Sequence, residues 1–429
     1  MNPAGRKVDW IYSVLPINIA LGPVGTFVQL YILELHGSVI DIGLATTLFN
    51  AVSIPAAMIW GYATDGFHRR KTIVVASYLA VTGSLALYLF ARTIYEVDAL
   101  YAIFSLVSSA AATPLNLLIM ETQPKPRWTL YFARFQTASA VGVTIGLLLG
   151  VGWTDFLPLD MMVAPLAALS LISAILAFAW ITEPSFVFEH GMIAMVRRSF
   201  FERLLALPMI FLRIPRILDF RRLFKGISYE LTRETQVLYL SIFAFYAASG
   251  IFNTSLVPSL NAAHLSQSQI FLVSLTAMAV QTMSFHYAAP YIERRSLKQA
   301  AVASLTLRFL SYASIGIAAY LVTGLMYLGA NLFFYTLGSG VAFAVYYAAS
   351  NVMIFNTLGH SNQGSALGVY SALVGIASTI GSFISGFTSF YFGYHVTFIL
   401  AAVGLVAAAT LTSLLGVSEV RNGGISQKL

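Results

Sequence analysis

The side chains of this chain that could do chemistry are few, and they are scattered through apolar sequence. The 429 residues include no cysteine, so thiolate nucleophiles, thiolate metal sites and disulfides are excluded. A membrane enzyme would need His, Asp or Glu side chains gathered at one depth, and the seven histidines are spread along the chain. We therefore expect neither an enzyme nor a bound metal or cofactor.

Charged side chains are rare inside the apolar segments. Glu34 and Glu121 each lie near a segment end, and with His286 they are the candidates for carrying a proton. Arg308 is the one base in the middle of an apolar segment. An intramembrane charge is a functional candidate by default, and the alternative is a long side chain that reaches back to the headgroups.

Polar uncharged side chains recur at helical spacing inside several segments. In the first segment Asn18, Gly22, Gly25 and Gln29 share one face. Polar groups facing lipid are costly, so such faces are expected to point inward. Packing between helices is the alternative for each residue. The candidates for lining a substrate cavity are Asn18, Gln29, Asn116, Tyr246, Asn253, Gln281, Tyr346 and Asn351.

Membrane-spanning helices are the elements that must position these residues. The chain is 58% hydrophobic and only 10% charged, with a mean hydropathy of +0.79, whereas soluble domains carry about 25% charged residues. A spanning helix needs roughly 20 apolar residues. Segments of that kind fall at 12–35, 42–63, 72–91, 98–120, 130–153, 161–182, 236–259, 267–290, 299–321, 324–355, 363–390 and 394–416. The sequence predicts an all-α integral membrane protein of twelve transmembrane helices.

The basic residues fix the orientation of these helices. All but Arg92 and Arg308 of the 24 Lys and Arg residues fall on one side if the N-terminus is cytoplasmic. Cytoplasmic loops carry an excess of Lys and Arg, so both termini are predicted to be cytoplasmic. The net charge of +7 therefore describes sidedness, and no nucleic-acid partner is expected.

A long polar segment divides the chain into two parts. We predict a six-helix bundle over 1–183, a cytoplasmic linker over 184–235, a second six-helix bundle over 236–418 and a cytoplasmic tail over 419–429. The linker alternates arginines with apolar residues, and over 197–225 it is expected to lie on anionic lipid headgroups. A plain tether and a regulatory or partner-binding segment are the alternatives.

The two parts also repeat one another in sequence. Residues 116–122 match residues 351–357, and Thr144-Ile145-Gly146 matches Thr379-Ile380-Gly381 at the same offset. Two matches at one offset indicate two halves in the same orientation, an arrangement found in transporters.

One loop between the second and third segments names a family. The stretch from Gly61 through Asp65 to Arg69, Arg70 and Lys71 resembles the signature loop of the major facilitator superfamily. Two positions depart from it, Gly66 in place of a usual base and His68 in place of a usual glycine. The resemblance implies that Asp65 latches the two halves together in the outward-facing state. Gly61 is expected to allow close helix approach, and the three bases are expected to bind lipid phosphates.

A second motif follows the fourth segment. The spacing of Glu121, Pro124 and Arg127 is similar to the family's acid–proline–base pattern. Glu121 is expected to pair with Arg127 or Arg134 when the inner side closes, or to be solvated in the loop.

The resemblance implies a fold of two pseudo-symmetric six-helix bundles and a monomeric transporter in the plasma membrane. Its first, fourth, seventh and tenth helices would line the cavity, while a peripheral ninth helix favours a snorkelling Arg308. With no fixed charge expected in the cavity, a neutral, zwitterionic or amphipathic organic solute is predicted, moved by alternating access. A non-transporting sensor or scaffold of the same fold, and a membrane enzyme, are the rival hypotheses.

Overall fold

The computed structural model describes residues 9–66, 70–123, 127–182, 233–357 and 363–415. Every regular element in these ranges is helical. Twelve of the helices formed there are long and apolar enough to cross a membrane, and each coincides with one predicted segment. The predicted linker, including 197–225, and the tail lie almost wholly outside the described residues.

The first six spans are built from short and long helices. They comprise η1 (Asp9–Ser13), α1 (Val14–Leu21) and α2 (Val24–Glu34); α3 (Val39–Gly66); α4 (Arg70–Leu87) and η2 (Tyr88–Phe90); α5 (Ile94–Ser108), η3 (Ser109–Ala111) and α6 (Ala112–Thr122); α7 (Trp128–Phe156); and η5 (Asp160–Met162) with α8 (Val163–Trp180).

The second six spans follow the same up-and-down course. They comprise α11 (Arg233–Ala262), α12 (Gln267–Glu293), α13 (Leu297–Leu321), α14 (Gly324–Tyr335) continued by the π-helical η7 (Thr336–Ala342) and α15 (Phe343–Thr357), α16 (Gln363–Phe392) and α17 (Tyr394–Ser413). The tenth span is therefore an α-helix interrupted by a π-helical segment.

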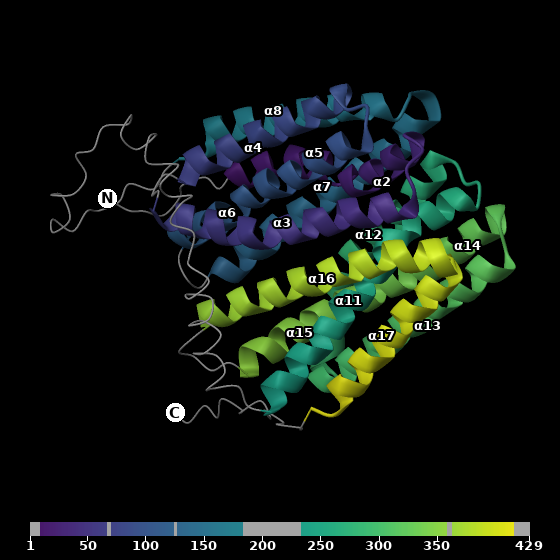
Figure 1. Ribbon diagram of the computed structural model, residues 1–429. Coiled ribbons are helices and arrows are strands. Elements are labelled where there is room, and N and C mark those ends of the chain that lie inside the picture. Colours follow the sequence, from purple (N-terminus) through teal and green to yellow (C-terminus); the bar gives the residue numbers. More distant parts are fainter. Residues whose placement is uncertain (1–8, 67–69, 124–126, 183–232, 358–362, 416–429) are drawn as a thin grey trace, which may run out of the picture.

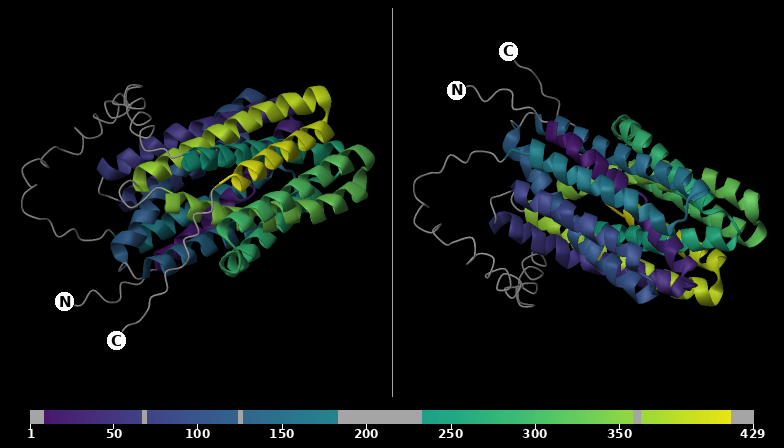
Figure 2. Two further views of the ribbon diagram at one scale, coloured as in Figure 1. Left: turned by 90° about the horizontal axis from the view of Figure 1, so that it is seen from below. Right: turned by 90° about the horizontal axis from the view of Figure 1, so that it is seen from above.

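The two sets of spans form two halves (Figure 1). Two further views show that the helices run roughly along one common axis (Figure 2). Because the number of crossings is even, the first span begins and the twelfth ends on the same side, here called the terminal side; Glu34 ends the first span on the opposite side.

The halves meet mainly through two helix pairs, α3 with α16 and α7 with α12. On α3 two backbones come together at glycines: a Cβ on Gly43 would lie 2.7 Å from the Cα of Gly386. On α7, a Cβ on Gly150 would lie 2.7 Å from the ring of Phe271. All four residues belong to the ends of their helices that face the opposite side, so the halves are closely packed there.

The terminal side is arranged differently. There α6 packs chiefly on other helices of the first half, and α15 packs chiefly on other helices of the second half. The ribbons of α3 and α16 also lie further apart at their terminal ends than at their opposite ends (Figure 1). The two halves therefore meet on the opposite side and diverge toward the terminal side.

Candidate functional site

A cavity of about 420 Å³ lies between the two halves. It is lined by side chains of α2, α3 and α5 from the first half and of α11 to α16 from the second. The lining residues are Gln29, Thr46, Phe49, Asn50, Tyr101, Tyr246, Ser249, Gly250, Asn253, Thr254, Gln281, Arg308, Tyr335, Ser339, Phe343, Ser378 and Ser382. The lining thus combines aromatic rings, amides, hydroxyls and one guanidinium.

Four of the eight predicted cavity residues line it: Gln29, Tyr246, Asn253 and Gln281. The Tyr246 hydroxyl is held 3.1 Å from the hydroxyl of Tyr370 on α16. The Oε1 atom of Gln29 is buried and has no hydrogen-bond partner among the described residues. The first half therefore presents an unused acceptor at this cavity.

The other four predicted residues lie outside the cavity in this conformation. Asn18 joins α1 to α7, because its Nδ2 donates to Val14 O at 2.8 Å and to Ser139 Oγ at 3.4 Å. Tyr346 is 2% exposed and packs with its ring centroid 4.0 Å from that of Phe245. The remaining two, Asn116 and Asn351, are placed on α6 and α15, toward the terminal ends of their spans.

Sequence reasoning missed the contribution of α3 and α5. Asn50 lies midway along α3, where its Nδ2 donates to Ser382 Oγ of the other half at 3.1 Å. Phe49 and Tyr101 stack beside it with ring centroids 4.5 Å apart. The position of the Asn50 amide in the middle of the apolar segment 42–63 could have indicated this contribution.

The prediction that Arg308 snorkels to the headgroups is wrong. This residue lies at the middle of α13, is 2% exposed and belongs to the cavity lining. Its Nε and Nη2 donate to the hydroxyl of Tyr312 at 3.0 and 2.6 Å. Its guanidinium carbon lies 4.7 Å from the ring centroid of Phe245 and 5.3 Å from that of Phe343. The expectation of a cavity without a fixed charge is therefore wrong as well.

Close packing of α13 on the π-helical segment brings Arg308 inward. A Cβ on Gly338 would lie 2.8 Å from the Cβ of Ser311, so only glycine fits there without a shift. Ser339, the next residue, places its hydroxyl 3.3 Å from that of Tyr312. Single π-helical segments inside α-helices are frequent at functional sites. Here the segment packs on α13 at Ser311, one helical turn from the arginine.

Arg308 has no acidic partner within the part of the chain that the structure describes. The one salt bridge formed there lies elsewhere, and no Asp or Glu belongs to the cavity lining. An uncompensated buried charge costs several kcal/mol. Aromatic faces offset about 0.5–2 kcal/mol each, so Arg308 retains an unmet need for negative charge.

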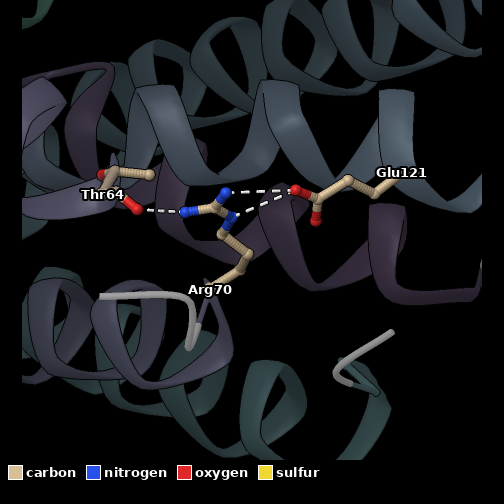
Figure 3. Close-up of polar contacts among 3 residues, drawn as sticks. All are labelled: Thr64, Arg70 and Glu121. Carbon is tan, nitrogen blue, oxygen red and sulfur yellow. Dashed lines mark hydrogen bonds and ion pairs between the residues drawn. The ribbon is translucent and has the colours of Figure 1, made fainter. Parts of the chain in front are cut away.

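That salt bridge joins the signature loop to the fourth span (Figure 3). Arg70 is buried, donates to the carbonyl oxygen of Thr64 and lies 3.1 Å from Glu121 Oε1. The expected pairing of Glu121 with Arg127 or Arg134 is not found in this conformation, and both arginines are exposed. They stand beyond the end of α6, whereas Arg70 begins α4, which packs directly on it.

Other residues of the signature loop are placed as follows. Arg70 is buried by protein, so its predicted role as a lipid anchor is wrong. Lys71 is half-buried with its Nζ 4.4 Å from the centroid of the Phe178 ring. A Cβ on Gly61 would meet no described atom within 4 Å, so the expected close helix approach is absent there. Asp65 is the last residue but one of α3, but its side chain and all of Arg69 lie outside the described residues.

The titratable candidates for proton coupling stand apart from the cavity lining. Glu34 Oε1 accepts a 2.6 Å hydrogen bond from Nε2 of Gln267, which joins the halves on the opposite side. Glu121 is bound to Arg70, and His286 is exposed on α12. Among the described residues no group of His, Asp or Glu is arranged to hold a metal ion.

Comparison with known proteins identifies relatives of the whole chain. The profile described as Major Facilitator Superfamily matches residues 13–220 and 238–427. No curated protein matches in sequence.

Several solved structures share the fold at low identity. The nucleoside transporter NupG is 14% identical, with a TM-score of 0.70 over 95% of this chain and 97% of its own. A bacterial homolog of the human lysosomal transporter Spinster, solved in an inward-facing and occupied conformation, is 13% identical, with a TM-score of 0.69 over 94% of each chain. The human organic anion transporter MFSD10 is 17% identical, with a TM-score of 0.56 over 96% of this chain and all of its own.

Proposed function

The chain belongs to the major facilitator superfamily, and we propose that it carries a small organic solute across the membrane by alternating access. It acts as a secondary active or facilitative transporter rather than as an enzyme. Its structural neighbours include a nucleoside transporter and an organic anion transporter, and both kinds of cargo are small organic molecules. We place the protein in the plasma membrane as a monomer with cytoplasmic termini.

The cavity between the halves is the observation that carries this proposal. Its volume of about 420 Å³ falls in the range of small-molecule sites, roughly 300–1,000 Å³. Both halves supply lining residues, Gln29 and Asn50 from one and Asn253 and Gln281 from the other. Rocking of one half against the other would therefore open and close the same site to the two sides.

The observed conformation corresponds to the inward-facing state of this cycle. The excess of Lys and Arg assigns the terminal side to the cytoplasm, and the halves diverge toward that side (Figure 1). On the opposite side they are held by Glu34 with Gln267, by Thr26 with Ser274, and by the Gly43–Gly386 approach. In the outward-facing state these contacts separate, and Asp65 latches the terminal side.

A cross-linking experiment tests alternating access directly, because the natural chain has no cysteine. The hydroxyls of Thr26 on α2 and Ser274 on α12 lie 3.5 Å apart across the two halves, so cysteines there are close enough to be bridged. The protein is reconstituted in proteoliposomes, and uptake of labelled uridine and labelled 4-hydroxyphenylacetate is measured. We expect oxidation of the T26C/S274C protein to stop the flux and reduction to restore it.

A cysteine pair inside one half provides the control. Ser255 on α11 and Ser389 on α16 have hydroxyls 2.6 Å apart in the second half, and bridging S255C/S389C should leave flux intact. Flux that survives the T26C/S274C bridge would contradict alternating access. Correctly folded protein that moves neither probe nor any member of a wider solute panel would favour the sensor or scaffold.

A further inference from the structure

We propose that Arg308 binds the carboxylate of the transported solute, so that the cargo is an amphipathic organic anion with a hydrogen-bond donor at its other end. This inference rests on the proposed function, since it names the substrate class of the same cavity. It replaces the expectation of a neutral cargo, which assumed a cavity without a fixed charge.

The hydrogen bonds of Arg308 leave one edge of its guanidinium free. Nε and Nη2 both donate to the single hydroxyl of Tyr312, which occupies the edge that these two nitrogens form. Nη1 is buried and has no acceptor among the described residues. The Nη1–Nη2 edge therefore keeps two parallel donors, the geometry that binds a carboxylate in a bidentate manner.

The surroundings of Arg308 hold this edge in place. The Tyr312 ring stacks on that of Phe252 at a centroid distance of 3.6 Å, and its hydroxyl also meets Ser339. Phe245 and Phe343 lie near the guanidinium with their ring faces toward it. The site is preorganised by neighbours that supply no negative charge, so a bound anion would be the first full counterion.

A residue of the other half that lines the same cavity also carries an unused polar atom. Gln29 Oε1 is a buried acceptor without a partner in the described part of the chain, and Gln29 lines the cavity with Arg308. Buried polar groups are nearly always hydrogen-bonded. One ligand with a carboxylate at one end and an O–H or N–H at the other would satisfy both atoms and bridge the halves.

The aromatic part of the cavity lining can contact an aromatic or aliphatic body. Phe49 and Tyr101 contribute rings from the first half, and Tyr335 and Phe343 from the second. Aromatic and apolar walls with a few placed polar groups are usual for small-molecule sites. Such walls favour an anion with an apolar body over a fully hydrated inorganic ion.

Matched probes test the charge preference. Binding to purified protein is measured by calorimetry for 4-hydroxyphenylacetate, for its uncharged amide 4-hydroxyphenylacetamide, and for 4-methylphenylacetate, which lacks the hydroxyl. We expect the acid to bind at least about tenfold more tightly than the amide, as a charged hydrogen-bonded pair implies. Loss of the hydroxyl should weaken binding by a smaller factor in wild type and have no effect in Gln29→Leu.

Variants assign the preference to Arg308. Arg308→Gln should bind the acid and the amide equally, while Arg308→Lys should retain part of the preference. Arg92→Gln removes an exposed arginine outside the cavity lining and should leave the preference unchanged. The affinities for the acid and for the amide are compared as a ratio within each variant. A general loss of stability would lower both affinities and would not change this ratio.

The outcomes separate this inference from the transport proposal. Equal binding of acid and amide to wild type, or a preference that survives Arg308→Gln, would overturn the anion site. Flux of uridine and 4-hydroxyphenylacetate in proteoliposomes, without preferential binding of the acid, would also overturn the anion site but would support the transport proposal. An Arg308-dependent acid preference without flux would support the anion site and overturn transport.

Discussion

The guanidinium of Arg70 lies 3.1 Å from the carboxylate of Glu121, and so ties the start of α4 to the last turn of α6 within one half of the protein (Figure 3). Both side chains are partly or fully screened from solvent, with exposed fractions of 8% and 24%. The pair holds the terminal ends of the third and fourth spans together. It is thus a contact within a rigid half rather than between the halves.

Removing one partner of this pair should destabilise the first half. In Glu121→Gln the buried Arg70 loses its counterion, which costs about 1–3 kcal/mol, and the melting temperature in detergent should fall. Arg127→Gln is the matched control, because Arg127 is exposed and exposed charges contribute little. Equal melting temperatures for Glu121→Gln and wild type would show that the pair is not structural.

Replacing Arg308 should have the opposite effect on stability. Arg308→Met removes a buried cation without an acidic partner in the described structure, and replacing a buried charge by an apolar side chain is often neutral or stabilising. We expect an unchanged or higher melting temperature for the ligand-free protein, together with loss of 4-hydroxyphenylacetate uptake. A melting temperature lowered by several degrees would indicate a structural arginine.

The π-helical segment can be probed at one glycine. In Gly338→Ala the new Cβ would meet Ser311 on α13 at 2.8 Å, and overpacking of this kind costs about 1–3 kcal/mol. The displaced α13 should carry Arg308 away from the cavity and weaken binding of 4-hydroxyphenylacetate. Gly329→Ala in α14 is the control, since its Cβ would have no neighbour within 4 Å. Equal affinities in the two variants would argue against positioning by the segment.

The latch role of Asp65 remains a prediction from the signature loop. Asp65→Asn should impair flux in proteoliposomes while insertion and yield stay normal, because only the outward-facing state would lose its contact on the terminal side. Wild-type flux in this variant would contradict the latch role of Asp65.

The spans were predictable because one physical constraint sets them. A hydrocarbon layer demands about 20 apolar residues per crossing, and all twelve segments from 12–35 to 394–416 correspond to described spans. The choice between lining and packing was less predictable. Asn18 and Gln29 share a helical face in sequence. Gly142 of α7 packs closely on Asn18, however, and the Asn18 amide hydrogen-bonds to α7 instead of lining the cavity.

Arg308 shows why the rest could not be read from the sequence. Its depth is visible from position alone, but the direction of its side chain depends on how closely α13 packs on the tenth span. That distance is set by Gly338 in a π-helical segment, which no periodicity in the sequence announces. Asn50 was missed for a related reason, since its partner Ser382 lies in the other half.

The meeting of Gly43 with Gly386 has a mechanical consequence for the proposed cycle. Two backbones touch there with no side chain between them, so the contact has no rotamers to rearrange when one half tilts. It can therefore separate and re-form without repacking as the halves rock, on the far side of the bilayer from the signature loop. A bulky residue at either glycine would keep the halves apart there and shift the balance between the two open states toward the outward-facing one.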